Sequence, residues 1–417
     1  MQKFHNQTDI TVKNSFEQTQ FIDWRTQAKD HKSYPKFFRR FNIDEFNEIK
    51  FIKNFGNITY TKKYANEEVY LRTNPSAGGL YPCEVYIQIR GVKGLLSGIY
   101  HYEPLTNTLA LIHELSNDGI EYYFKKNSSK KFIFLISNVY FRSSWKYEKR
   151  AIRYLLLDTG HQLGSIYVAL KIADLEHDFC FDFDKNLLNK EFGFDNSEFF
   201  QGAILIDNKK DTKYKKLREK LVSVSATDYQ IKEPFIEDFA ASLEKEKYKK
   251  VFALDFLNTI QKKELQKTIN NRRSVRVFKK ESIQKEEYEF ILKDIFEFAL
   301  LFDIELFFIN NNINGLEKGI YKNVTLLQKG EYKDIATKLA FNQKLAGTSA
   351  FTLFYTSNIE SNYVQNYILS GFIAHIISLK ARYLNIGSSG IGAYFDDECQ
   401  NILKTTNNIL YLQAIGR

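Results

Sequence analysis

The chain has 417 residues, of which 44% are apolar and 15% aromatic, so it can bury a large core and is longer than one typical domain requires. Its formal net charge is +9, but lysines and arginines alternate with acidic residues, as in 244–250, which is typical of a solvated surface. We therefore expect a globular protein of two domains, or of one duplicated domain, that does not bind nucleic acid.

Cysteine, histidine and hydropathy patterns exclude several further classes. Cys83, Cys180 and Cys399 are far apart and odd in number, and no histidine pair has HExxH or HxH spacing. We therefore expect no metal site and no disulfide framework. The chain has no apolar run of about 18 residues, and its polar start contains no signal region. We expect a cytoplasmic protein that does not enter a membrane.

The first distinctive segment runs from Arg72 to Tyr102. It opens with PSAGGLYP, residues 75–82, where two prolines bracket a run of small residues, and continues into a strand-like alternation at 84–89 and glycine-rich turns. Small side chains allow backbone N–H groups to approach a flat or anionic ligand. Taken alone, the PSAGG residues favour a simpler interpretation, an ordinary turn before a hairpin.

A second segment, Trp145 to Arg150, reads WKYEKR and precedes a helix that we expect over 150–173. Lys146 and Tyr147 are side chains that can act as a base near neutral pH, a lysine when desolvated and a tyrosine beside a cation. Composition alone favours a simpler interpretation, the solvated start of a helix.

The chain contains an internal repeat with a constant offset of 221 residues. The segments EVY, GL and GIY of the first half correspond to ELF, GL and GIY of the second, at 84–86, 94–95 and 98–100 and at 305–307, 315–316 and 319–321. An apolar strand, a long helix and a last strand follow in each half. We therefore predict two α+β domains at 1–207 and 251–417, joined by a linker at 208–250.

The second half begins with an arginine-rich run and ends with a glycine-rich one. Arg272, Arg273, Ser274 and Arg276 bring three guanidinium groups and a hydroxyl within five residues, a compact anion site because the arginine fork suits phosphate. Their spacing alone favours a simpler interpretation, a surface basic cluster. The PSAGG segment has no counterpart in the second half, and the run at 387–392 has none in the first, so the two losses are complementary.

PSAGGLYP, the following EVY strand and the GIYHYEP run together resemble the SagB-type dehydrogenases, which are FMN enzymes of the nitroreductase superfamily. The RRSVR run similarly resembles the amino-terminal signature of nitroreductases. This resemblance implies two tandem nitroreductase-like domains, each an antiparallel or mixed sheet flanked by helices. It further implies that they form a pseudo-dimer within one chain around a single FMN. It leaves open whether the pseudo-dimer pairs again as a homo-oligomer.

The resemblance also assigns the site residues. For the phosphate and flavin ring, it implies contacts from Arg272, Arg273, Ser274, Arg276, Gly390 and Arg417 of the second half. For the flavin face, it implies Pro75, Ser76, Ala77, Gly78 and Gly79 of the first half. Gln343 resembles a further polar position beside the flavin. Lys146 and Tyr147 resemble the Lys-Tyr pair that is tied to azoline oxidation, so they are the expected catalytic residues.

The implied function is an FMN-dependent azoline dehydrogenase. It would oxidise thiazoline or oxazoline rings of a ribosomally synthesised precursor peptide to thiazoles or oxazoles, after a partner cyclodehydratase has formed those rings. Two alternatives stay open. One is an NAD(P)H-dependent flavin reductase of nitro, enone or dehydroamino acid groups, and the other is a flavin-free scaffold that docks the peptide or the cyclodehydratase.

Overall fold

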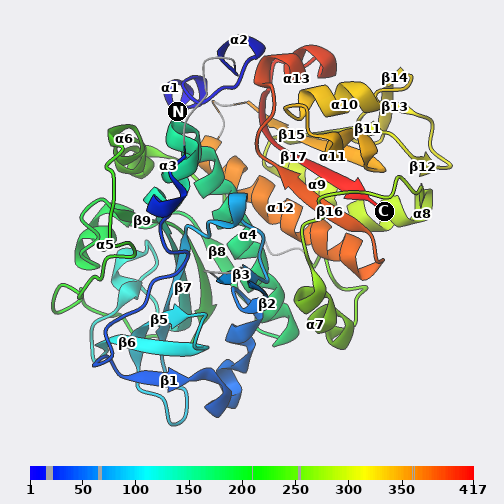
Figure 1. Ribbon diagram of the computed structural model, residues 1–417. Helices are drawn as coiled ribbons and strands as arrows, with labels where there is room; N and C mark the ends of the chain where they lie inside the picture. Colours follow the sequence, from blue (N-terminus) through cyan, green and yellow to red (C-terminus); the bar gives the residue numbers. More distant parts are fainter. Residues whose placement is uncertain (16–21, 64–67, 209, 252–254, 359, 361) are drawn as a thin grey trace. The chain divides into compact units, whose positions relative to one another are not determined.

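The computed structural model describes residues 1–417 except 16–21, 64–67, 209, 252–254, 359 and 361 (Figure 1). The chain divides into two compact units. The first unit is Asp23–Ala253, and the second unit combines Met1–Ile22 with Leu254–Arg417. Residues 208–250, predicted as a linker, thus belong to the first unit, and the amino-terminal residues belong to the second. The positions of the units relative to one another are not determined, so each is described by itself.

The first unit is built on a seven-stranded sheet with the order β1-β6-β5-β4-β7-β9-β8. These strands are β1 (Arg40–Asn42), β4 (Cys83–Ile89), β5 (Gly98–Glu103), β6 (Thr108–Glu114), β7 (Lys130–Val139), β8 (Asp178–Cys180) and β9 (Glu198–Asp207). β2 (Ile58–Lys63) and β3 (Glu68–Arg72) form a separate antiparallel hairpin that leads into PSAGG. The sheet is antiparallel at every neighbouring pair that the structure describes.

The α-helices of the first unit are α3 (Tyr140–Tyr147), α4 (Ala151–Ile172), α5 (Lys185–Glu191) and α6 (Pro234–Ser242). Short 3-10 turns η1 to η7 lie at Trp24–Thr26, Ile43–Glu45, Asn47–Asn54, Ala77–Gly79, Ile120–Tyr123, Glu148–Arg150 and Leu243–Lys245. Residues 151–170 of α4 are all buried. A helix buried on every side carries apolar residues on all faces, so α4 shows no amphipathic stripe, although it also buries a few polar residues such as Asp158.

The second unit has a six-stranded sheet with the order β14-β13-β11-β15-β17-β16. Its strands are β11 (Ile304–Asn310), β13 (Gly319–Lys322), β14 (Thr325–Lys329), β15 (Phe351–Ser357), β16 (Gly387–Ile391) and β17 (Asn408–Gly416), while β10 (Ile283–Gln284) and β12 (Ile313–Asn314) pair separately. Its helices are α1 (Gln2–Asn6), α2 (Val12–Ser15), α7 (Lys262–Asn271), α8 (Lys285–Leu292), α9 (Ile295–Leu301), α10 (Lys333–Leu339), α11 (Lys344–Thr348), α12 (Tyr363–Tyr383) and α13 (Asp396–Leu403).

The two sheets have the same strand order and the same register, which confirms the predicted duplication. β6-β5-β4-β7-β9-β8 of the first unit corresponds to β14-β13-β11-β15-β17-β16 of the second. Ile87 pairs with Tyr100 in the first unit, and Phe308 pairs with Tyr321 in the second. Both residues of the second pair are numbered 221 higher than their counterparts in the first. A register shift after Ile99 recurs after Ile320. Each unit is therefore one copy of the same α+β architecture.

The repeated Gly-Ile-Tyr segment serves this architecture. The Tyr100 hydroxyl donates a hydrogen bond to the Leu96 carbonyl at 2.6 Å, and the Tyr321 hydroxyl donates to the Glu317 carbonyl at 2.7 Å. Both bonds close the turn before a strand. Since the same bond occurs in both units, this part of the PSAGG-to-GIY resemblance reflects the fold rather than a ligand contact.

The amino-terminal segment belongs to the second unit through contacts with α13. The Ile10 N–H donates to Asp396 Oδ2 at 2.9 Å, and the Asp396 N–H donates to the Ile10 carbonyl at 2.8 Å. His5 Nε2 lies 3.3 Å from Asp9 Oδ1 beside them. In the described part of the chain, no helix, α4 and α12 included, combines the length and apolar character that a membrane crossing needs.

Candidate active site

The PSAGG segment forms the loop between β3 and β4 and is fixed by a buried carboxylate. The Ser76 hydroxyl donates to Asp158 Oδ2 at 2.5 Å, and the Ala77 N–H donates to Asp158 Oδ1 at 3.2 Å. The Tyr81 N–H in turn donates to Ser76 Oγ at 2.9 Å. Gly78 has a φ of 64°, in the left-handed region where a side chain is disfavoured. The loop backbone is therefore held in one conformation.

Asp158 was not singled out by sequence reasoning, although a signal was present. It is the one acidic residue of α4 and follows three leucines. Its side chain is 2% exposed, and burial raises its pKa to about 7, while the hydrogen bonds from Ser76 and Ala77 oppose this rise. An acid in an otherwise apolar stretch of helix needs partners, and here the PSAGG loop supplies them.

Tyr147, a predicted catalytic residue, lies against the same loop. It ends α3, and a Cβ atom at Gly78 would be 2.6 Å from the Tyr147 hydroxyl oxygen. The absence of a side chain at Gly78 therefore allows the phenol to reach the loop. The Tyr147 ring also packs on Tyr154 of α4, with ring centroids 4.3 Å apart.

Lys146, the other predicted catalytic residue, is surrounded by aromatic rings. Its ammonium lies 5.3 Å from the ring centroid of Trp24 and 5.6 Å from that of Tyr147. Trp24 packs edge-on against Trp145, whose indole N–H donates to Thr26 Oγ1 at 2.8 Å. These rings attract the ammonium form of the lysine and fix its position at the end of α3.

Arg142 joins α3 to the end of the PSAGGLYP segment. Its guanidinium donates to the Tyr81 carbonyl at 2.9 Å and to the Lys29 carbonyl at 2.6 Å, and it lies 2.7 Å from Glu84 Oε1. Burial opposes the ionisation of Glu84, but Arg142 and His101 hold its pKa well below its usual range. Asp158 and Arg142 thus fix the two ends of the segment that faces Tyr147.

In the second unit, the arginine-rich run lies beside the glycine-rich strand β16. Ser274 forms a bridge with Ser388, and the Val275 N–H donates to the Ser388 carbonyl at 3.1 Å. Arg272 is buried at the end of α7, and Arg273 donates to the Asn270 and Arg272 carbonyls at 3.0 and 2.6 Å. Arg276, which follows them, is exposed.

The remaining predicted cofactor residues all have structural partners. A Cβ atom at Gly390 would be 1.7 Å from the Tyr411 hydroxyl oxygen, so packing alone requires glycine there. Gln343 Nε2 donates to the Ala393 carbonyl, just after β16, at 3.4 Å. Arg417 donates to both carboxylate oxygens of Glu287, at 3.0 and 2.5 Å, and this bond lowers the pKa of Glu287.

The predicted residues thus gather into two groups, one in each unit. The PSAGG residues, Lys146 and Tyr147 lie together in the first unit, whereas the arginine-rich run and Gly390 lie together in the second. The distance between the two groups is not determined, so the predicted shared site stays a prediction.

The polar groups near these residues fit a flavin mononucleotide in chemical terms. The buried side-chain oxygens of Asn74, before the PSAGG loop, and of Ser389, beside Gly390, have no hydrogen-bond partner among the described residues. Apart from its chain neighbours, no atom of the described residues lies within 4 Å of a Cβ position at Gly79, so the loop leaves its backbone uncovered there. Guanidinium groups suit the phosphate, while hydroxyl, amide and backbone groups suit the flavin ring.

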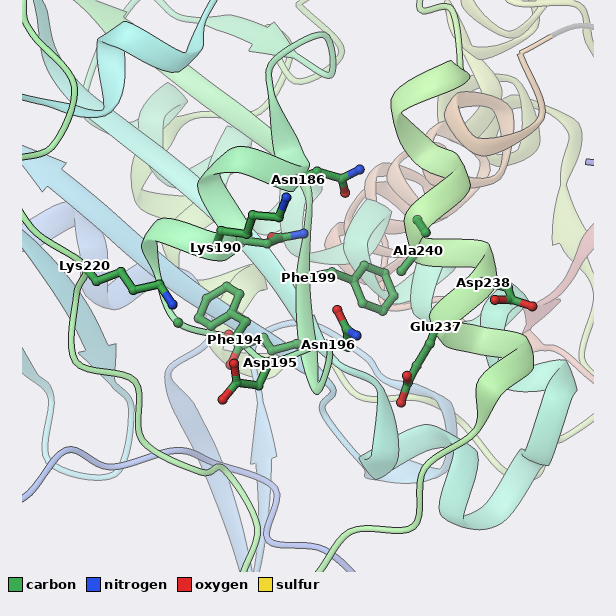
Figure 2. A pocket seen from close by; sticks show the side chains of 14 residues that line it. Asn186, Lys190, Phe194, Asp195, Asn196, Phe199, Lys220, Glu237, Asp238 and Ala240 are labelled. Carbon is green, nitrogen blue, oxygen red and sulfur yellow. The ribbon is translucent and has the colours of Figure 1, made fainter.

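Two other features of the described chain do not involve the predicted residues. A cavity of about 600 Å³ in the first unit lies between α5, the start of β9 and α6 (Figure 2), and its lining includes Lys190, Lys220, Asp195, Glu237 and Asp238. In the second unit, ligand-type atoms of His5, Asp9 and Asp396 lie within 4.8 Å of one another. Sequence spacing did not reveal this group, because its members come from opposite ends of the chain.

Comparisons with known proteins identify the fold. A crystal structure from Anabaena variabilis, of a protein assigned as a nitroreductase, covers 100% of this chain and 99% of its own, with a TM-score of 0.83 and 22% identity. A Methanocaldococcus jannaschii protein, also assigned as a nitroreductase, is 27% identical over 123 residues, which are 28% of this chain and 61% of that protein. Indigoidine synthase of Streptomyces lavendulae is 30% identical over 108 residues, 26% of this chain and 8% of that protein.

The chain thus spans less than two thirds of the length of either curated relative, and no family model matches it. The structural match over the whole chain nevertheless agrees with the two repeated sheets described above. The chain therefore has a nitroreductase-like fold along its full length, with two sheet-containing units in tandem.

Proposed function

We propose that this chain is an FMN-dependent oxidoreductase that dehydrogenates azolines, converting thiazoline or oxazoline rings of a ribosomally made peptide into thiazoles or oxazoles. The observation that carries the proposal is the close approach of the Tyr147 hydroxyl to Gly78 of the PSAGG loop. Residues that the resemblance assigns to catalysis and to the flavin face lie together in one unit, although they are far apart in the sequence. Asp158 and Arg142 of the same unit hold the backbone of this loop through hydrogen bonds with Ala77 and Tyr81.

The cofactor, when bound, supplies an acceptor for a hydride. Arg272, Arg273, Ser274 and Arg276 would hold its phosphate, with Gln343, Gly390 and Arg417 as further contacts from the second unit. The backbone of Pro75 to Gly79 would lie against the flavin ring. Because each unit keeps the group of residues that the other lacks, we infer one FMN per chain.

Lys146 and Tyr147 would carry the proton transfer. Aromatisation of an azoline breaks two C–H bonds of the ring, and one hydrogen leaves as a proton while the other leaves with its electron pair. A base must therefore be held at the ring carbon, and the end of α3 presents an amine and a phenol side by side. The surrounding rings of Trp24 and Tyr154 restrict both side chains and so favour one reacting geometry.

The proposal includes two macromolecular partners: the precursor peptide and the cyclodehydratase that makes the azoline. A direct test incubates the purified chain with FMN and a synthetic peptide that contains one thiazoline. We expect one FMN per chain, and we expect the peptide to lose the mass of two hydrogen atoms. Two FMN molecules per chain would contradict the shared-site argument. A colourless protein that cannot be reconstituted with FMN would favour a flavin-free scaffold instead.

The second candidate function uses the same flavin in the reductive direction. It is favoured by the similarity to the M. jannaschii protein assigned as a nitroreductase. Under this alternative, the protein would oxidise NAD(P)H steadily in the presence of a nitro, enone or dehydroamino acid acceptor. The azoline peptide would stay unchanged in the same preparation, which separates the two functions.

A further inference from the structure

Ser76 has three hydrogen-bonding directions, and the structure accounts for two of them. A hydroxyl oxygen carries one hydrogen and two lone pairs. The Tyr81 N–H occupies one lone pair at 2.9 Å, and Asp158 Oδ2 lies 2.5 Å away in a second direction. Ser76 itself is half-buried, and we infer that its third direction is the one that a ligand on the PSAGG loop would meet.

The protonation state of Asp158 determines whether Ser76 presents its hydrogen or a lone pair in that third direction. When the carboxylate is ionised, the Ser76 hydrogen points to Asp158, and a lone pair remains in the third direction. When Asp158 is neutral, its own hydrogen is donated to Ser76 Oγ, and the Ser76 hydrogen must turn to the third direction. The Tyr81 and Ala77 N–H groups keep their acceptors in both states.

We propose that Asp158 is a positioning residue that switches Ser76 between hydrogen-bond acceptor and hydrogen-bond donor toward a ligand bound on the PSAGG loop. For a flavin ligand, this inference rests on the proposed function. Asp158 is separated from the ligand by Ser76, so it acts through the orientation of one hydroxyl hydrogen and not by contact with the reacting atoms.

The surroundings of Asp158 allow both states near neutral pH. Burial raises its pKa to about 7. From β4, Cys83 faces it as a thiol whose pKa burial raises well above its ordinary value, so the thiol stays neutral. Arg72 acts on Cys83 from the start of the loop, His161 follows one turn later on α4, and Tyr147 reaches Gly78 from α3.

The edge of an oxidised flavin ring offers several acceptor atoms and one N–H donor. A donor at Ser76 therefore matches more of that edge than an acceptor does, and the neutral form of Asp158 should favour binding. The expected sign is tighter FMN binding below pH 7 than above it. The gain or loss of one hydrogen bond corresponds to about a three- to tenfold change in Kd.

The test is a fluorescence titration of flavin-free protein with FMN at pH 6, 7 and 8. For the natural chain, we expect Kd to rise about three- to tenfold between pH 6 and 8. Asp158→Asn donates an amide hydrogen to Ser76 at every pH, so its Kd should stay near the natural value at pH 6. The phosphate of FMN itself titrates near pH 6 and affects the natural chain and Asp158→Asn alike. The contribution of Asp158 is therefore the difference between the Kd-against-pH profiles of these two proteins.

Cys83→Ser is the matched control, because it changes a titratable group that faces Asp158 and should keep the natural pH profile. Ser76→Ala should bind FMN more weakly and without the pH dependence. If Asp158→Asn retains the full natural profile, the inference is overturned.

If FMN does not bind at any pH, the proposed function fails, and infrared spectroscopy of the ligand-free protein decides the inference separately. We expect a carboxylic acid C=O band that titrates near neutral pH, disappears in Asp158→Asn and shifts in Ser76→Ala. The absence of this band, or a band that Ser76→Ala leaves unchanged, overturns the switch independently of flavin.

Discussion

The two units share a sheet but differ in the segments that connect its strands. In the first unit, β7 is followed by the separate helix α3, which carries Lys146 and Tyr147, before α4 begins at Ala151. In the second, β15 ends at Ser357 and α12 begins at Tyr363, which leaves no room for such a helix. β4 follows the PSAGG loop, whereas β11 follows α9. The shared segments are those the sheet requires, and the unshared ones carry the residues assigned to chemistry.

The largest effect is expected from a substitution in α3, the helix that distinguishes the first unit in this comparison. Lys146→Ala should reduce azoline turnover by about 10²- to 10⁴-fold, because loss of a residue of the proton-transfer pair costs that much, and it should retain the yellow flavin colour. Lys149→Ala is the matched control, since Lys149 lies three residues later, is exposed, and contacts the ring of Phe235 instead. Equal losses in both variants would remove Lys146 from the catalytic role.

The second prediction concerns α4, which contains the buried acid Asp158, whereas the corresponding helix α12 contains no acidic residue. We expect this acid to make stability depend on pH. Asp158 has a folded-state pKa raised to about 7 from an ordinary 3.8, so folding favours its neutral form. Its stabilising contribution is complete below about pH 4 and is lost as the pH rises toward 7. The expected loss is on the order of a few kcal/mol. Chemical denaturation between pH 4 and 8 should show it in the natural chain and a flatter profile in Asp158→Asn. A natural profile that rises with pH across this range, relative to Asp158→Asn, would contradict the prediction.

The third prediction concerns the arginine-rich run, which the second unit alone keeps. Arg272→Ala should weaken FMN binding by about ten- to a hundredfold, because a charge-assisted hydrogen bond is lost. Lys279→Ala, an exposed cation a few residues later, should bind FMN normally. Equilibrium dialysis measures both. If Arg272→Ala retains flavin while Lys146→Ala loses it, the assigned roles are reversed.

The smallest effect is expected from substitutions in the turn that both units share. Tyr100→Phe and Tyr321→Phe each remove the hydrogen bond that closes the turn before β5 or β13. Each should lower the free energy of unfolding by about 0.5–1.5 kcal/mol and by similar amounts. Tyr122→Phe, at an exposed tyrosine, should change it little. Unequal effects of the first two variants would show that the repeated turn has diverged in one unit.

The duplication was predictable because strand pairing preserves residue spacing. A constant offset survives only where each residue keeps its partner across the sheet, as the pairs of β4 with β5 and of β11 with β13 do. The membership of residues 208–250 and of the first 22 residues was not predictable from pattern. These segments are polar and aperiodic, and contacts such as the one between Ile10 and Asp396 assign them to their units.

The sequence singles out the candidate site residues, whose roles stay predictions, but not the residues that hold them in place. PSAGG and the Lys-Tyr pair stand out by composition and resemblance, and Gly78 and Tyr147 do meet in the first unit. Asp158 stands out only as the one acid of an otherwise apolar stretch of helix, and its partner, like that of Arg142, is brought to it by the fold from a distant position. A buried acid or base is informative in a sequence only when its partners are known.

The amino-terminal attachment to α13 determines how the protein can be cut into parts. A recombinant fragment that starts near residue 254 would carry α13 without Ile10, leaving the Asp396 carboxylate without the N–H that Ile10 donates. A fragment ending near residue 253 would keep Ile10 but lack Asp396, its hydrogen-bond partner. Separate expression of the halves should therefore begin from a rearranged gene, in which the first 22 codons are transferred to the second half.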